Sequence, residues 1–420
     1  MTDSTNITDT EIRSGRRALR VVNALNAVVL AFLMEHVLIL YAVRNGLSDS
    51  LVALIASLPH LSVPFIFVGR AIVAHRGLAR TWSETGLIRF LAILIVLPAA
   101  ALPGAHLLPV RAGLIITGVT VFAIFGSIGK VSINPLTAEV AGPGSGPGRY
   151  IFGNFLWFNI VYFIAMAMAI LLLRLSDSIG VYILLIILGM LAGMIGSRTV
   201  RKIPESAASS AVVSGTPRGV LRLLRHHTEY RSLVLAWAMG YAAFIAVTPI
   251  AVLTARNGYR FADYLVLVLP LCLVVGQITA SLINRSVADR VGPRRLLLRS
   301  IIGFGAVAVF WAFAPEGLSF LAAAAVFVVA GIFQSGIVVG FQQYFVAHVA
   351  QHHRVDVSLL TETAAGVSAG VFGSVVASGL LGILPRFVDG LDVYRWYFRA
   401  ALVLCVIAVT AIHRLPAHHE

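Results

Sequence analysis

Glu35 and His36 interrupt the apolar segment FLMEHVLIL, where an ionisable side chain carries chemical meaning. Placing a charged side chain at the centre of a bilayer costs about 2.5–3.5 kcal/mol on insertion scales, so such residues commonly serve function. Burial favours the neutral form of a carboxyl group, which lets a glutamate take up and release a proton as its access to water changes. We therefore predict that Glu35, with His36 as a second candidate, binds a proton or a substrate. A glutamate that is solvated or paired with arginine, and a hydrogen-bonded packing histidine, also fit the sequence.

The composition requires apolar surroundings for these groups. Hydrophobic residues make up 59% of the 420 residues and charged residues 12%, against roughly 25% charged residues in soluble domains. Mean hydropathy is +0.91. This balance predicts an all-α integral membrane protein in contact with the lipid bilayer. The net charge of +14 is scattered over loops, which argues against nucleic-acid binding because a nucleic-acid-binding domain gathers its basic residues on one face.

Apolar runs of the length that a helix needs to cross the hydrocarbon predict twelve transmembrane helices. They lie near residues 20–42, 50–71, 85–103, 111–133, 151–174, 179–198, 231–254, 262–284, 296–314, 318–341, 360–384 and 395–413. Most of the 32 Arg and Lys residues fall in the even-numbered loops and the terminal segments. The positive-inside rule therefore places both termini in the cytoplasm. Arginine greatly outnumbers lysine, which is typical of a GC-rich bacterial genome, so we expect the cytoplasmic (inner) membrane of a bacterium.

The longest polar stretch divides the twelve predicted helices into two sets of six. It contains the linker-like sequence SAASSAVVSGTPRG. We predict an N-terminal six-helix half over residues 1–198, a cytoplasmic linker over 199–230 and a C-terminal six-helix half over 231–420. Two pseudo-symmetric halves of this kind are typical of transporters that arose by duplication.

A related charged turn occurs in both predicted halves. The sequence DRVGPRR, residues 289–295, aligns with AHRGLAR, residues 74–80, so that Gly292 matches Gly77 and Arg295 matches Arg80. In each copy a glycine lies in the short turn between two predicted helices. The second copy also places an acid, Asp289, at a helix end.

These turns, together with the six-plus-six layout, resemble the major facilitator superfamily, whose loops carry a pattern close to G-x-x-x-D-R-x-G-x-R-R. The second copy matches it at Asp289, Arg290, Gly292, Arg294 and Arg295. The resemblance implies a conformational switch in which Asp289 holds the cytoplasmic side closed. Arginines that only fix topology are the alternative. In the first copy Ala74 stands where the acid belongs, so a first-half switch built on Gly77 and Arg80 is left open. We also predict a cytoplasmic charge network of Glu84, Arg89, Glu139 and Arg149.

The resemblance implies that helices 1, 4, 7 and 10 line a central cavity. Their polar and aromatic residues are then substrate candidates, joined by residues from helices 5 and 8 that could reach the cavity: Asn23, Asn26, Thr117, Thr120, Trp237, Tyr241, Gln334 and Tyr344, with Asn154, Trp157, Asn159 and Gln277. An aromatic and amide lining suits a neutral or zwitterionic organic solute. Ordinary interhelical hydrogen bonding is the alternative for each residue.

No phosphate-binding loop, nucleophile elbow or zinc-protease signature occurs, so we expect no enzyme, no cofactor and no bound metal. The sequence predicts a secondary active transporter that works as a monomer and moves a small organic solute by alternating access, coupled to H⁺. A multidrug or metabolite efflux antiporter is one alternative. A membrane assembly factor, a lipid or pigment handler and a sensor with the same fold are alternatives of another class.

Overall fold

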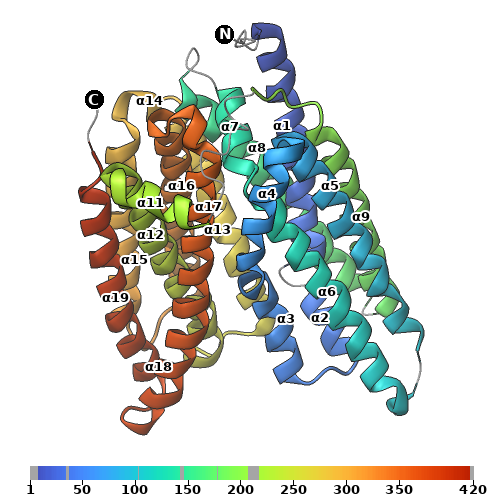
Figure 1. Ribbon diagram of the computed structural model, residues 1–420. Helices are drawn as coiled ribbons and strands as arrows, with labels where there is room; N and C mark the ends of the chain where they lie inside the picture. Colours follow the sequence, from blue (N-terminus) through green and yellow to red (C-terminus); the bar gives the residue numbers. More distant parts are fainter. Residues whose placement is uncertain are drawn as a thin grey trace. The chain divides into compact units, whose positions relative to one another are not determined.

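The computed structural model describes residues 8–416, with gaps at 35–36, 103, 142–145, 177 and 207–216. Within these residues, eleven helical segments are long and apolar enough to cross a bilayer, and the shorter apolar helix Val268–Asn284 is a twelfth. Each of these segments overlaps one of the twelve predicted transmembrane helices. The described residues contain helices and no strands, so the prediction of an all-α membrane fold is confirmed (Figure 1).

The α-helices are separated by short turns and by segments of 3-10 and π-helix. Those before residue 201 are α1 (Asp9–Val29), α2 (Val37–Arg44), α3 (Asp49–Leu61), α4 (Ile66–Arg76), α5 (Leu78–Leu91), α6 (Leu108–Lys130), α7 (Ile133–Ala141), α8 (Pro147–Leu175) and α9 (Ile179–Val200). The later ones are α11 (Pro217–His226), α12 (Thr228–Leu253), α13 (Asp263–Asn284), α14 (Ala288–Val291), α15 (Pro293–Ala312), α16 (Phe320–His348), α17 (Arg354–Ser368), α18 (Ala377–Ile383) and α19 (Leu391–His413).

The chain forms two compact units, each of which takes a short segment from beyond the linker. The first unit comprises Met1–Gly142, Trp157–Gly215 and Ala350–Leu359, and the second Pro143–Leu156, Thr216–Val349 and Leu360–Glu420. The start of α8 therefore groups with the later helices, and the start of α17 groups with the earlier ones. The predicted boundaries at residues 198 and 231 stay a prediction.

In the first unit, α1 packs on α9, and α5 packs on both α6 and α9 (Figure 1). Glycines permit the close approaches. A Cβ atom on Gly69 of α4 would overlap the backbone carbonyl of Ile128 in α6, and one on Gly193 of α9 would overlap the ring of Phe90. Small residues at such crossings let helix backbones come together in membranes.

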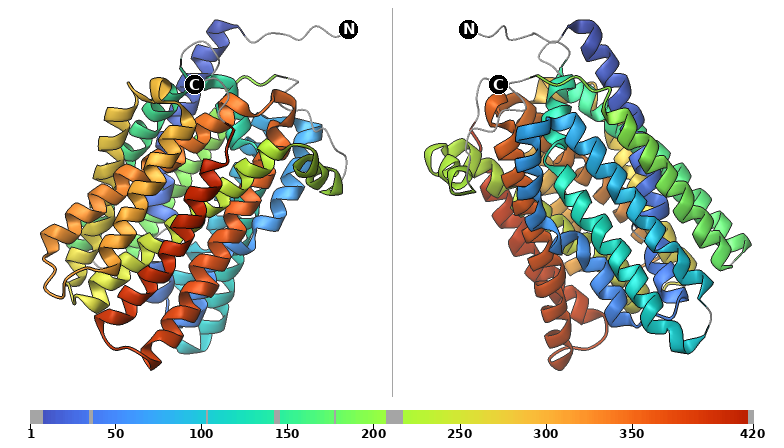
Figure 2. Two further views of the ribbon diagram at one scale, coloured as in Figure 1. Left: turned by 90° about the vertical axis from the view of Figure 1, so that its left-hand side faces the viewer. Right: turned by 45° about the vertical axis from the view of Figure 1, so that its right-hand side comes forward.

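In the second unit, α13 packs on α16, while α15 packs on α16 and α19 (Figure 2). A Cβ atom on Gly276 of α13 would overlap the carbonyl of Val328, and one on Gly331 of α16 would overlap the carbonyl of Leu273. Both glycines therefore mark one crossing where α13 and α16 lie in backbone contact.

One face of α8 is apolar and exposed. Trp157, Ile164, Met168, Leu171 and Leu175 are all exposed, and their spacing of three, four and seven residues puts them on one face of the helix. A face of this kind suits hydrocarbon as its surroundings.

Candidate functional site

Asp289 caps a helix of the second unit. Gly292, with φ of +81°, adopts a left-handed conformation that glycine permits, and it ends α14 just before α15. This turn holds Asp289 against the start of α8, where Oδ1 accepts a hydrogen bond from the Gly148 amide at 2.7 Å and Oδ2 accepts one from the Arg149 amide at 3.0 Å. Gln343 of α16 donates to Oδ1 at 3.3 Å. The carboxylate satisfies amides that have no partner within the helix.

Asp289→Ala is expected to free these two amides and to lower stability by about 1 kcal/mol, the usual effect of losing a helix cap. Hydrogen exchange of the purified protein should speed up at Gly148 and Arg149, while exposed Arg290→Gln should leave both rates unchanged. Unchanged protection of both amides in Asp289→Ala would contradict the capping role.

The corresponding turn of the first unit has a different acid. Gly77, with φ of +78°, links α4 to α5, and Ala74 precedes it. The carboxylate that caps α5 is Glu205, whose Oε2 accepts from the Leu78 amide at 2.6 Å and the Ala79 amide at 2.9 Å. Glu205, which follows α9 in the sequence, thus caps the start of α5.

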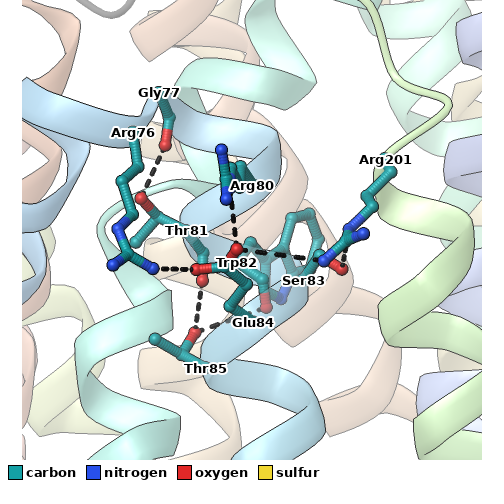
Figure 3. Close-up of polar contacts among 9 residues, drawn as sticks. All are labelled: Arg76, Gly77, Arg80, Thr81, Trp82, Ser83, Glu84, Thr85 and Arg201. Carbon is teal, nitrogen blue, oxygen red and sulfur yellow. Dashed lines mark hydrogen bonds and ion pairs between the residues drawn. The ribbon is translucent and has the colours of Figure 1, made fainter.

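Glu84 lies among the arginine side chains near this turn (Figure 3). Its carboxylate accepts from Arg76 at 2.5 Å and from Arg80 at 2.7 Å, and Arg201 lies 3.9 Å away. Arg201 also donates to Ser83 at 3.0 Å. Because the arginine side chains are more than half exposed, this cluster contributes little to stability.

The first unit also contains a buried ion pair. Nε of Arg70 in α4 donates to Oδ1 of Asp356 in α17 at 2.6 Å, with the two side chains 7% and 2% exposed. A second pair joins Arg354 of α17 to Glu139 of α7 at 3.3 Å, and Gln351 donates to the same carboxylate at 3.0 Å. The start of α17 therefore meets the earlier helices through one acid and one base.

The four residues of the predicted charge network lie in separate places. Glu84 belongs to the exposed arginine cluster and Glu139 to the pair with Arg354. Arg149 contributes its backbone amide to Asp289. Arg89 lies against aromatic rings, with its guanidinium carbon 4.1 Å from the centroid of Phe122.

Two cavities of the first unit adjoin Arg89. One, of about 200 Å³, lies among α1, α5, α6 and α9; the other, of about 210 Å³, lies among α2, α3, α5 and α6. Arg89, Gly126 and Lys130 line both cavities. Asn26, one of the predicted substrate residues, lines the first.

The other substrate candidates take varied positions. Trp237 stacks on Phe341 with ring centroids 3.9 Å apart and lies 5.6 Å from the ring of Tyr241. Tyr344 donates to the carbonyl of Pro416 at 3.2 Å.

Four buried candidates have side-chain polar atoms without a hydrogen-bond partner: Asn154, Asn159, Trp237 and Gln334. Gln277 is also buried, Asn23 and Thr120 are half-buried, and Thr117 and Trp157 are exposed. Glu35 and His36 lie outside the described residues.

Of the second-half switch residues, Asp289 caps the start of α8 and Gly292 forms the turn after α14, and their role as a switch stays a prediction. Arg294 donates to the carbonyl of His413 at 2.6 Å, whereas Arg290 and Arg295 are exposed. The sequence did not single out Arg70, Lys130, Glu205 or Asp356 as site residues. A signal existed for Arg70, which lies inside an apolar run. Among the described residues, no group of three or more His, Cys, Asp or Glu side chains could hold a metal ion.

Solved transporter structures share this architecture. The major facilitator superfamily transporter FucP, in an outward conformation, matches with a TM-score of 0.72 and 13% identity over 97% of this chain and 100% of its own. The proton:xylose symporter XylE matches with a TM-score of 0.73 and 12% identity over 96% of both chains. A bacterial homologue of the iron transporter ferroportin, in an outward-facing state, matches with a TM-score of 0.71 and 10% identity over 96% of this chain and 99% of its own.

No family model and no curated protein matches the sequence. The structural likeness is nonetheless continuous over nearly the whole chain, and it defines the class of the fold. The protein has the twelve-helix membrane fold of the major facilitator superfamily.

Proposed function

We propose that the protein is a secondary active transporter of the bacterial cytoplasmic membrane that moves a small organic solute by alternating access. The observation that carries this proposal is the likeness to three transporters over at least 96% of the chain, with TM-scores of 0.71–0.73. The two cavities of the first unit suit this proposal, because transporters of this kind bind solutes between their membrane helices and rock their halves around them.

In this proposal the charged contacts at the helix starts belong to one conformational state. Asp289 on α8, and the pairs that α17 makes through Asp356 and Arg354, each join helix ends within one unit, and we expect them to form in one state of the transport cycle and to break in the other. The arginine-rich loops support the cytoplasmic placement of this end.

A screen for the solute tests the proposal. A ligand that binds only the folded protein raises its melting temperature by mass action. Detergent-purified protein would be melted with sugars, amino acids, nucleosides, organic acids and cationic drugs, and a stabilising solute would be followed into proteoliposomes with and without a proton gradient. Saturable uptake would support the proposal. Cooperative melting without a stabilising solute would favour a lipid-handling or sensory role.

We propose Glu35 as the proton-coupling residue, since the solved structures with this fold include a fucose:proton symporter and a proton:xylose symporter. Glu35→Gln keeps the size of the side chain and removes its titration. We expect pH-driven accumulation of the solute to fall at least tenfold, while exchange of labelled for unlabelled solute continues. Glu316→Gln is the matched control, because Glu316 is 88% exposed. Unchanged pH-driven accumulation in Glu35→Gln would assign proton coupling to another residue.

A further inference from the structure

Arg399 lies inside a membrane helix of the second unit. It belongs to α19, which begins at Leu391, and it is the last charged residue before the uncharged run 400–412. At a rise of 1.5 Å per residue, Arg399 lies about 12 Å along the helix. An arginine at the edge of an apolar run lies where the lipid headgroups meet the hydrocarbon, because its long side chain can extend toward the polar side.

Two aromatic rings lie beside the Arg399 guanidinium. Its carbon is 4.5 Å from the ring centroid of Trp396, one turn earlier in α19, and 5.1 Å from that of Phe313, which directly follows α15. Trp396 is 48% exposed and Phe313 65%. Aromatic rings attract a cation, and tryptophan is enriched at the level of the headgroups. The rings therefore keep the guanidinium near the exposed surface of α15 and α19.

The neighbouring Arg395 is satisfied within the protein. It donates to the carbonyl of Ala314 at 2.6 and 3.1 Å and to the carboxylate of Asp392 at 2.8 Å. Arg399 instead has rings as neighbours, and rings supply no oxygen acceptor for its N–H donors. Within the described part of the chain, Nε of Arg399 has no hydrogen-bond partner. Because Arg399 is half-buried, part of its side chain is accessible to an acceptor from outside the protein.

An exposed apolar face continues from Arg399 along both helices. Val403 and Val406 of α19 are exposed, as is Val309 of α15. Their spacing of three and four residues puts the two valines of α19 on the face of Arg399, and Val309 on the face of Phe313. The helices α15 and α19 pack on each other, and the contact of Phe313 with Arg399 joins the two faces. This surface suits hydrocarbon chains along its length and an anion at one end.

We propose that this surface binds a diacyl phospholipid, with its phosphate on Arg399 and an acyl chain along the exposed faces of α15 and α19. A guanidinium offers two parallel N–H donors that match two phosphate oxygens. A phospholipid is the favoured occupant, because one molecule supplies both the anion at headgroup level and the hydrocarbon beside it. The lipid belongs to the leaflet on the side where α19 begins. This lipid site is additional to the proposed transport of a solute and does not depend on it.

Native mass spectrometry of the purified full-length protein resolves bound lipids by mass and tests the lipid site. Dimyristoylphosphatidylglycerol and dimyristoylglycerol form a matched pair of probes, because they share both acyl chains and differ in the phosphate headgroup. The phospholipid should bind the more tightly of the two. Arg399→Gln should weaken its binding about tenfold, the effect of losing a hydrogen bond between charged groups. The double variant Phe313→Leu with Trp396→Leu stays apolar, removes the rings and should also weaken binding.

Arg174→Gln is the matched control, because Arg174 is an exposed arginine at the end of another membrane helix, α8. It should bind the phospholipid like the unaltered protein. Equal binding of the two lipids, unchanged affinity in Arg399→Gln, or an equal fall in Arg174→Gln would overturn the lipid site. Each variant is first shown to melt cooperatively. If Arg399→Gln does not fold, unchanged affinity in the double ring variant would overturn the site equally.

Discussion

Asp356→Ala is expected to lower the free energy of unfolding by about 3–5 kcal/mol, because it leaves the Arg70 guanidinium in a buried position without its carboxylate. The pair is short, at 2.6 Å, and both side chains are more than nine-tenths buried. Denaturant unfolding of the detergent-purified protein, followed by intrinsic fluorescence, measures the loss.

Two further variants separate charge from shape in this pair. Replacing a buried ion pair by apolar residues of similar volume is often neutral or stabilising, so the double variant Arg70→Met with Asp356→Leu should recover most of the lost stability. Glu84→Gln is the exposed counterpart and should cost less than about 1 kcal/mol. A small effect of Asp356→Ala, equal to that of Glu84→Gln, would show that the Arg70 pair is not buried in solution.

Gly331→Ala should force α13 and α16 apart, because its new Cβ atom would overlap the carbonyl oxygen of Leu273. Backbone atoms cannot move aside as the end of a flexible side chain can. Overpacking of this kind typically costs 1–3 kcal/mol and occasionally more. The expected result is a clear fall in melting temperature, measured on purified protein in the same detergent.

Gly153→Ala is the matched control for this substitution. Gly153 lies within α8, and a Cβ atom there would meet nothing within 4 Å. Alanine favours the helix over glycine by about 0.8–1.0 kcal/mol, so Gly153→Ala should be neutral or stabilising. Equal melting temperatures for both variants would contradict the close crossing of α13 and α16.

The sequence predicted the membrane helices well because an apolar run of fixed length is a strong and local signal. It was less accurate at helix ends that extend into polar sequence. The first apolar run begins near residue 20, yet α1 begins at Asp9, where Thr8 and Glu11 form a capping box. Similarly, α5 begins at Leu78, well before its apolar run, because Gly77 and Glu205 set its start.

Residues of the candidate site could be recognised from the sequence only where they lie close together along the chain and form a motif. The Asp289 turn could be recognised because its acid and its glycine are three residues apart. The Arg70 and Asp356 pair spans 286 positions of the chain, and hydropathy contains no information on such a contact. Arg89 was predicted in a charge network and Lys130 was not singled out, and only the folded helices place both beside the same cavities.

The short segment Ala350–Leu359 has a consequence for any attempt to divide the gene at the linker. The first unit includes this segment, so a fragment that stops at residue 198 lacks the carboxylate of Asp356 and the guanidinium of Arg354. The complementary fragment in turn lacks the amides of Gly148 and Arg149 that Asp289 binds. Each fragment alone therefore lacks partners for groups at its helix ends. Both fragments must be present together for these contacts to form.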